Sequence, residues 1–417
     1  MLTLDQIQTV ALAGLVLFVG YGVRRLVPVL AKYNIPAPVV GGLLMAGFIT
    51  AARVGNWTPF AFTTTLQAPL MIAFFTTIGF GASLSLLRVG GPAVLLFFVL
   101  STLMAVGQNV IGILAAYGLG QHPLMGVLAG SVTLTGGPAT GLAFAPQFET
   151  AGVPSAATLA VAAAMAGIVC GGIIGGPIAT RLISRLGIKD RDVHPRGARG
   201  LARAIVEDKM AERPPSAPTG EDVESYGLLK ALVLILVAMW AGSWVSTWIT
   251  TLDFNGNGVN DITLPAYIGA MLVAAVIRNF DDGTKLIGIS QRTVDDLGGT
   301  ALSLFLVMAL MTLKLWDLVG VAVPLAVMLI LQVVAIAVVA ATVVHRLMGR
   351  DYESAVMAGG FCGFMLGTTA NAMANMEALV ERYGPAPKAF LVVPMVGAFF
   401  VDFTNAIIIT FCLNIWS

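Results

Sequence analysis

Long apolar runs separated by short polar segments dominate the chain. Crossing the hydrocarbon of a bilayer takes about 20 mostly apolar residues, and ten segments approach or exceed that length. They fall at about 8–30, 36–54, 69–87, 92–117 and 155–180, and beyond a polar linker at about 226–251, 264–280, 299–318, 320–345 and 389–415. The pattern predicts an all-α polytopic membrane protein with five transmembrane helices on each side of the linker.

Two further apolar segments, at about 124–148 and 352–376, are interrupted by glycine and polar residues. If each enters and leaves the membrane on one face, every basic residue except Arg53 and Lys314 lies on the side of the arginine-rich linker. Cytoplasmic loops carry the excess of Lys and Arg. The charges therefore favour two re-entrant or broken hairpins, a cytoplasmic linker and both termini outside the cell.

Short matches at an offset of about 230 residues relate the two halves. They pair Val40-Gly41 with Ile268-Gly269, Val127 to Gly130 with Val356 to Gly359, and Met165-x-Gly167 with Met395-x-Gly397. We predict repeats at 1–184 and 226–417, joined by the linker 185–225. Because each half has an odd number of crossings, the copies must be inverted, and inverted repeats with paired broken segments are typical of secondary transporters. Ordinary packing similarity among glycine-rich helices is the alternative.

Composition narrows the class of protein. The chain is 57% hydrophobic and only 11% charged, whereas soluble domains carry about 25% charged residues, so a soluble enzyme is excluded. A net charge of +1 provides no field for nucleic acid. The three cysteines are isolated, without metal-binding spacing. No phosphate-binding GxxxxGK[ST] motif is present, which argues against ATP-driven transport.

The first interrupted segment contains a predicted helix break. Gly136 and Gly137 interrupt one half-helix, and Pro138 suits the start of the next. The free amides and the positive dipole of such a helix start can hold an anionic group. The hydroxyls of Thr135 and Thr140 are candidate ligands for a hard cation.

The second interrupted segment offers side chains rather than a glycine pair. Asn371 and Asn375 are four residues apart, so they share one helix face, and their amides could bind carboxylate or ammonium groups. Thr368 and Thr369 precede them. For both interrupted segments, the alternative interpretation is that the small residues serve close helix packing.

Asp402 lies between apolar residues in the last predicted span. A carboxylate at membrane depth is costly and marks a candidate functional site. We predict that Asp402 ligates a cation with Asn405 or Thr404 and a loop carbonyl; a proton carrier and a structural hydrogen-bond anchor are the alternatives.

Three other polar side chains fall within or beside predicted spans. Lys314 is near a span end, so it is either an interfacial lysine whose ammonium reaches water or a partner for a substrate carboxylate. Gln108 and Asn109 lie mid-span, as interhelical hydrogen-bond partners or as a polar lining.

Enzymes and channels explain these features less well. An intramembrane aspartyl protease needs two carboxylates that share a proton, and Asp402 has no obvious second. A serine protease with a histidine base needs a histidine at depth, and none is available. A passive channel does not require paired binding loops.

Four stretches of the chain resemble the bacterial glutamate:sodium symporter family: Pro69 to Gly79, Ala129 to Gly137, Met308 to Trp316 and Phe390 to Phe400. The resemblance covers nearly the whole chain. It implies sodium-coupled uptake of glutamate across the cell membrane, two inverted halves with glycine-rich re-entrant loops, a homodimer and an elevator-like motion. A carrier of another carboxylate, such as a dicarboxylate or a citrate-like acid, is the alternative.

The resemblance also assigns site residues. The first family loop falls on Thr135, Gly136, Gly137, Thr140 and Gly141, and the second loop and last span fall on Gly367, Thr368, Ala374 to Met376, Asp402 and Asn405. The first loop of the family usually reads Gly-Gly-His-Gly-Thr, whereas Pro138 and Ala139 stand between Gly137 and Thr140 here.

Overall fold

The computed structural model describes residues 2–55, 57, 60–187, 221–251, 264–318 and 320–416. The predicted linker at 185–225 lies outside them except at its two ends. The described chain is helical apart from loops and one parallel pair of two-residue strands, β1 (Leu2–Thr3) and β2 (Phe60–Ala61). The predicted all-α class is therefore confirmed for the part of the chain that the structure describes.

The helices of the first half follow the predicted order. They are α1 (Gln6–Leu26), α2 (Pro28–Lys32), α3 (Ala37–Val54), α4 (Gln67–Gly81), α5 (Leu84–Gly118), α6 (Pro123–Val127), the π-helix η1 (Leu128–Val132), α7 (Gly137–Thr150) and α8 (Ala156–Arg185). Helix α5 is kinked at Gly91, where φ is +65° and ψ is −164°. Gly91 immediately precedes Pro92, which lacks a backbone N–H, so the break is encoded locally.

The second half has a similar order of elements. They are α10 (Glu221–Thr250), α11 (Ala266–Thr284), α12 (Gln291–Met311), the 3-10 helix η2 (Leu315–Leu318), α13 (Ala322–Val339), the π-helix η3 (Ala340–Val344), α14 (His345–Leu347), α15 (Tyr352–Met365), α16 (Thr369–Tyr383), α17 (Pro387–Met395), the π-helix η4 (Val396–Phe400) and α18 (Val401–Trp416).

Helices occupy all ten positions predicted to cross the membrane, but several predicted ends are wrong. Seven described helices are long and apolar enough to span a bilayer. Helix α4 ends at Gly81 rather than near 87, and α12 ends at Met311 rather than near 318. The apolar composition continues past both ends, so it could not mark them. The last predicted span is divided by η4.

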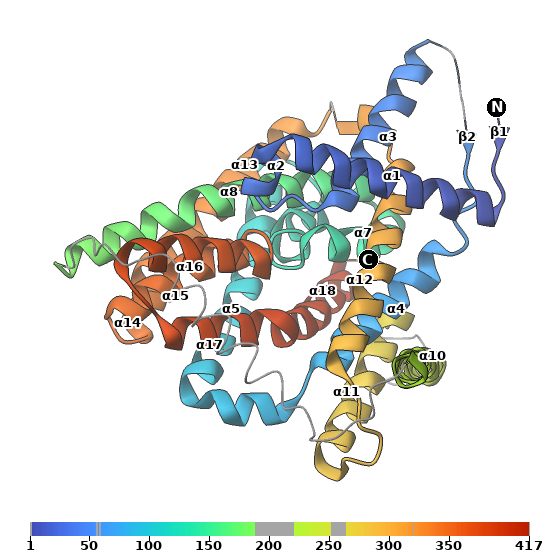
Figure 1. Cartoon of the computed structure of the whole chain (residues 1–417). Helices are drawn as coiled ribbons and strands as arrows, with labels where there is room; N and C mark the ends of the chain where they lie inside the picture. Colours follow the sequence, from blue (N-terminus) through green and yellow to red (C-terminus); the bar gives the residue numbers. More distant parts are fainter. Residues whose placement is uncertain are drawn as a thin grey trace.

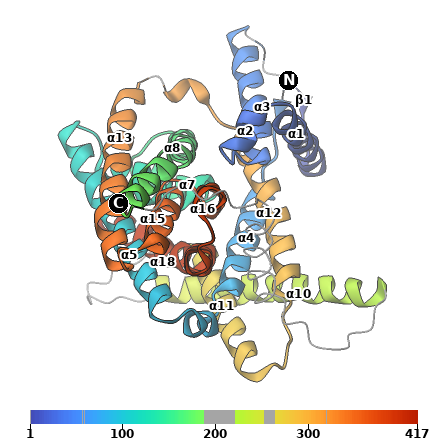
Figure 2. The same cartoon turned by 60° about the vertical axis from the view of Figure 1, so that its left-hand side comes forward.

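Two bundles divide the molecule, and each takes helices from both sides of the linker (Figures 1 and 2). The first bundle comprises α1, α3, α4, α10, α11 and α12. In Figure 2, α4 and α12 lie side by side, with α1 and α3 toward one end of the pair and α10 and α11 toward the other. The second bundle comprises α5 to α8 and α13 to α18, and it holds both interrupted segments.

Equivalent glycines pack the outer helices of the first bundle. A Cβ atom on Gly41 of α3 would lie 2.2 Å from the carbonyl oxygen of Val16 in α1. A Cβ atom on Gly269 of α11 would lie 2.2 Å from the carbonyl oxygen of Gly242 in α10. Gly41 and Gly269 are one of the pairs matched between the two halves, and both allow two helix backbones to touch.

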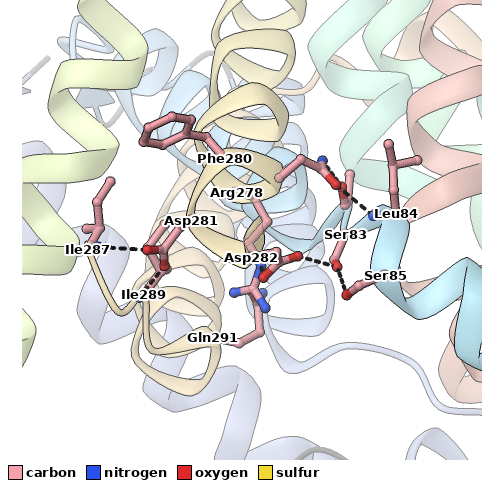
Figure 3. Close-up of polar contacts among 12 residues, drawn as sticks. Ser83, Leu84, Ser85, Arg278, Phe280, Asp281, Asp282, Ile287, Ile289 and Gln291 are labelled. Carbon is pink, nitrogen blue, oxygen red and sulfur yellow. Dashed lines mark hydrogen bonds and ion pairs between the residues drawn. The ribbon is translucent and has the colours of Figure 1, made fainter. Parts of the chain in front are cut away.

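The connection from α4 to α5 joins the two bundles and is fixed to the end of α11 (Figure 3). Asn279 donates to the carbonyl oxygen of Ala82 and accepts from the amide of Leu84, both at 2.8 Å. Ser83 donates to Asp282, which also pairs with Arg278 at 3.0 Å. The first bundle thus holds the start of α5 through side chains of α11.

Candidate functional site

Two helical hairpins meet inside the second bundle. Hairpin 1 consists of α6, η1 and α7, and hairpin 2 consists of α15 and α16. We call residues 133–137 tip 1 and residues 366–368 tip 2. A Cβ atom on Gly137 would lie 3.6 Å from the carbonyl oxygen of Gly367 and 3.9 Å from Cγ2 of Thr368. The structure therefore brings the two predicted loops next to each other.

The local sequence explains where each tip turns into a helix. Gly137 has φ +70°, a conformation that favours glycine, and it begins α7 with Pro138 in the first turn. In hairpin 2, Thr368 caps α16, and its hydroxyl accepts from the amide of Asn371 at 3.4 Å. The predicted helix break at Gly136 and Gly137 is confirmed, and a second helix start faces it.

One side chain of α5 contacts tip 1 and the end of α15, next to tip 2. Thr135 of tip 1 donates its hydroxyl to Oε1 of Gln108 at 2.6 Å, and Nε2 of Gln108 donates to the carbonyl oxygen of Met365, at the end of α15 just before tip 2, at 2.8 Å. Gln332 of α13 donates to the carbonyl oxygen of Gln108 at 2.6 Å. Both glutamines are fully buried. Helices α5, α13 and α15 and tip 1 therefore meet at one buried polar junction.

The two asparagines of α16 share one helix face, as predicted, and that face is buried against α8. Asn371 donates to the carbonyl oxygen of Ile168 at 2.8 Å. Asn375 donates to the carbonyl oxygens of Gly171 at 2.9 Å and Gly359 at 3.3 Å. The amide N–H groups therefore hold hairpin 2 against α8, while Oδ1 of Asn371 is buried with no hydrogen-bond partner in the described structure.

The segment from η4 into α18 lies beside both hairpins. Thr369 of hairpin 2 donates to the carbonyl oxygen of Gly397 at 3.0 Å. Asn405 donates to the carbonyl oxygen of Ser131 in hairpin 1 at 2.9 Å. Oδ1 of Asn405 and Oγ of Ser131 are both buried without a partner among the described residues. Unpartnered oxygens of this kind are suitable ligands for a hard cation.

Asp402 occupies the first turn of α18, between these two contacts, and is partly buried. It makes no hydrogen bond or ion pair with the residues that the structure describes. Thr404 lies close by along the chain; its hydroxyl is 3.4 Å from that of Thr102 in α5 and bonds back to its own helix. The structure thus places the three predicted cation ligands on one helix turn beside the hairpins.

Thr140 and Gly141 differ in their surroundings. Thr140 is buried next to Gly136, and its hydroxyl makes no hydrogen bond within the described chain. A Cβ atom on Gly141 would lie 2.8 Å from that of Ala160 in α8. Thr140 therefore offers a polar group at the tip, whereas Gly141 allows close packing between α7 and α8.

Lys314 lies apart from the tips. It follows the end of α12, is exposed, and lines a cavity of about 370 Å³ together with Glu149 and Asp317. Glu149 is twelve residues beyond Gly137 in α7, which corresponds to roughly 18 Å along the helix axis. Lys314 is therefore a predicted site residue that the structure does not bring to the hairpin junction.

Sequence reasoning left some of these contacts unassigned. The sequence alone does not distinguish a structural role from a lining role for Gln108, and it predicts no role for Gln332 or for Ser131. Gln332 did carry a signal, because it is the single polar side chain of α13, and an isolated polar group inside an apolar span usually finds a partner across helices.

The architecture is that of a multi-pass helical membrane protein with a buried polar junction between two hairpins. The family model described as sodium/glutamate symporter matches residues 2–385. The sodium/glutamate symporter of Haemophilus influenzae is 38% identical over 408 residues, 97% of this chain and 96% of the relative. Those of Escherichia coli K12 and Shigella flexneri are 39% identical over 413 residues, 98% of this chain and 97% of each relative. The chain belongs to the sodium/glutamate symporter family, as the sequence resemblance predicted.

Proposed function

We propose that this protein is a secondary transporter that couples sodium entry to the uptake of glutamate. The observation that carries the proposal is the similarity to proteins named sodium/glutamate symporters, which extends over 97–98% of the chain and includes both hairpins. The polar junction agrees with this function, because it supplies unpartnered oxygens within an apolar bundle. All three relatives are named as transporters and none as an enzyme.

We infer that glutamate binds where the tips meet. The amides of Gly137 and Ala139 at the start of α7 make no hydrogen bond with the described residues and are suited to a carboxylate. The amide of Gly136 already donates to the carbonyl oxygen of Ser131 at 3.0 Å. Thr140, Thr368 and Oδ1 of Asn371 supply further polar contacts. Lys314 lines a separate cavity with two carboxylates, which is the opposite of what two substrate carboxylates and one ammonium group require. We therefore do not include Lys314 in the proposed glutamate site between the tips.

We further propose two inverted repeats, 1–184 and 226–417, with re-entrant hairpins and an elevator-type movement of the second bundle against the first. The equivalent contacts of Gly41 and Gly269 support the repeats. Two bundles linked through a kinked α5 are compatible with such a movement. A cytoplasmic linker and external termini follow from the charge distribution, and a homodimer follows from the family resemblance.

The topology can be tested with two single-cysteine variants, Ser216→Cys and Ser417→Cys, in a chain without Cys170, Cys362 and Cys412. An impermeant thiol reagent should label the two positions from opposite sides of the cell membrane, because the linker is expected inside and the C-terminus outside. Permeabilised cells, in which both positions should react, serve as the control. Labelling from the same side would contradict the inverted repeats.

Uptake into proteoliposomes tests the function itself. Radiolabelled glutamate should accumulate when an inward sodium gradient is imposed and should not accumulate when choline replaces sodium. Unlabelled glutamate should compete fully, whereas citrate should not. Full competition by citrate would indicate a carrier of other carboxylates, and flux that ignores the sodium gradient would indicate a channel.

The tip site is tested by Thr140→Val, which removes a buried hydroxyl while keeping the shape of the side chain. Leaving a substrate group unpaired costs about 1 to 3 kcal/mol, so the dissociation constant of glutamate should rise roughly 5- to 150-fold. Thr150→Val is the matched control, because Thr150 is an exposed residue of the same helix whose hydroxyl donates only to the carbonyl oxygen of Pro146, one turn earlier. Equal affinities in both variants, measured by calorimetry, would place the substrate elsewhere.

A further inference from the structure

Gln108 is the one described side chain that hydrogen-bonds both to tip 1, at Thr135, and to the end of α15 at Met365, just before tip 2. We propose that Gln108 is a positioning residue, which joins the two tips into one unit and orients the Thr135 oxygen toward a cation or an ammonium group. This inference deepens the proposed function and rests on it. It resolves the ambiguity that the sequence left at this position.

The hydrogen-bond inventory fixes the direction of each contact. The carbonyl oxygen of Met365 can only accept, so the amide nitrogen of Gln108 must face it, and Oε1 must face Thr135. Because Oε1 can only accept, the Thr135 hydroxyl must donate its single hydrogen to it. Only lone pairs of Thr135 are then left for a ligand. Thr135 is thus suited to sodium or to the substrate ammonium group and unsuited to a carboxylate.

The position of Gln108 is itself held by neighbouring elements. Gln332 of α13 donates to its carbonyl oxygen at 2.6 Å. The adjacent Asn109 accepts from the amide of Ser131 in hairpin 1 at 3.0 Å. A Cβ atom on Gly130 would lie 3.1 Å from the carbonyl oxygen of Gln108. The part of α5 around Gln108 is therefore held between hairpin 1 and α13.

We call the two hydrogen bonds of the Gln108 amide, to Thr135 and to Met365, the tie, and they have a functional consequence. If tip 1 or the end of α15 shifts alone, a fully buried donor or acceptor of Gln108 loses its partner, and such losses are costly away from water. The tips therefore move together, and the geometry of the cation ligands changes with that of the substrate ligands. Loosening the tie should weaken sodium and glutamate binding in parallel.

The test uses Gln108→Asn, which keeps a buried amide but is one methylene too short to reach both partners. The full-length protein is reconstituted, and the sodium concentration for half-maximal uptake and the KM for glutamate are measured beside the wild type. Both constants should rise about 5- to 150-fold, the range for one unpaired buried group. Ser101→Ala is the matched control, because Ser101 is buried in the same helix and its hydroxyl has no partner among the described residues; it should behave as wild type.

Hydrogen exchange provides a measurement that does not depend on transport. Amides at 128–140 and at 363–371 should both exchange faster in Gln108→Asn than in the wild type. Thr135→Val removes only the hydrogen bond between Thr135 and Gln108. It should nevertheless accelerate exchange in hairpin 2 as well, because the side-chain amide of Gln108 is then free to rotate. This variant also serves if Gln108→Asn does not fold. The double variant should be no worse than Gln108→Asn alone.

These results distinguish the role of Gln108 from the proposed sodium-coupled uptake of glutamate. Wild-type constants and wild-type exchange in Gln108→Asn would overturn the inference, and so would a loss of thermal stability with both constants unchanged, since that marks a purely structural role. Additive effects of Gln108→Asn and Thr135→Val on the hydrogen-exchange rates would show that the two residues act separately, which also contradicts the inference. If the wild-type protein itself fails to take up glutamate with sodium, the proposed function fails, while the exchange experiment still decides on the tie.

Discussion

Asp402→Asn is expected to abolish sodium-driven accumulation of glutamate while the protein still folds. A carboxylate within a membrane helix is costly unless it is paired, and Asp402 has no partner among the described residues. Asparagine keeps the size of the side chain and removes the charge. The proposed cation site would then lose its one anionic ligand, with only the neutral oxygens of Asn405, Thr404 and the loops left.

The size of the effect follows from the energy that one sodium ion carries. A tenfold concentration gradient is worth about 1.4 kcal/mol, and a membrane potential of about 100 mV adds about 2.3 kcal/mol per charge. Each sodium ion that is coupled therefore contributes about 3.7 kcal/mol, which corresponds to a factor of roughly 500 in the accumulation ratio. A variant that no longer couples one sodium ion should lose an accumulation factor of this order.

Two measurements check this prediction. The sodium dependence of glutamate binding should become weak in Asp402→Asn, and the final gradient in proteoliposomes should collapse. Asp296→Asn is the control, because Asp296 is an exposed carboxylate of α12 in the first bundle. If Asp402→Asn keeps wild-type sodium affinity and uptake, the carboxylate is structural, and the cation site consists of loop carbonyls and hydroxyls alone.

The sequence predicts local features well, because their physical causes are local. Ten apolar runs give helices, since burial in lipid requires internally satisfied backbone groups. The pair Gly136-Gly137 predicts a helix break, and Gly137 indeed needs a positive φ. The spacing of Asn371 and Asn375 predicts a shared face, which follows from helix geometry alone.

Contacts between distant segments were not predictable in the same way. The partners of Asn371 and Asn375 are backbone carbonyls of α8, more than two hundred residues away, and a carbonyl leaves no trace in the sequence. The role of Gln108 depends on three elements from both halves. The apolar run that includes Lys314 predicts a longer span, whereas α12 ends three residues before Lys314, at Met311.

Gly167→Ala should disturb both tips through a single methyl group. Gly167 lies in α8, where an added Cβ atom would be 2.4 Å from the carbonyl oxygen of Leu366 in tip 2 and 2.6 Å from Cδ2 of Leu134 in tip 1. The carbonyl belongs to the backbone and cannot rotate away. Overpacking of this kind costs about 1 to 3 kcal/mol of folding stability, and the displaced tips should bind glutamate more weakly.

The direction of the change in thermal stability distinguishes Gly167 from a glycine of α8 that has space around it. In a helix interior, alanine is favoured over glycine by roughly 0.5 to 1 kcal/mol, so a glycine with space around it should gain stability on substitution. Gly176 is such a residue, because a Cβ atom there would have no neighbour within 4 Å in the same helix α8. Thermal unfolding in detergent should therefore show Gly176→Ala at or above the wild type and Gly167→Ala below it, with sodium-dependent glutamate binding reduced only in the latter. If the two variants behave alike, the contact of α8 with the tips does not shape the site, and the hairpins must be held by Asn371, Asn375 and Gln108 without help from the close approach of the backbones.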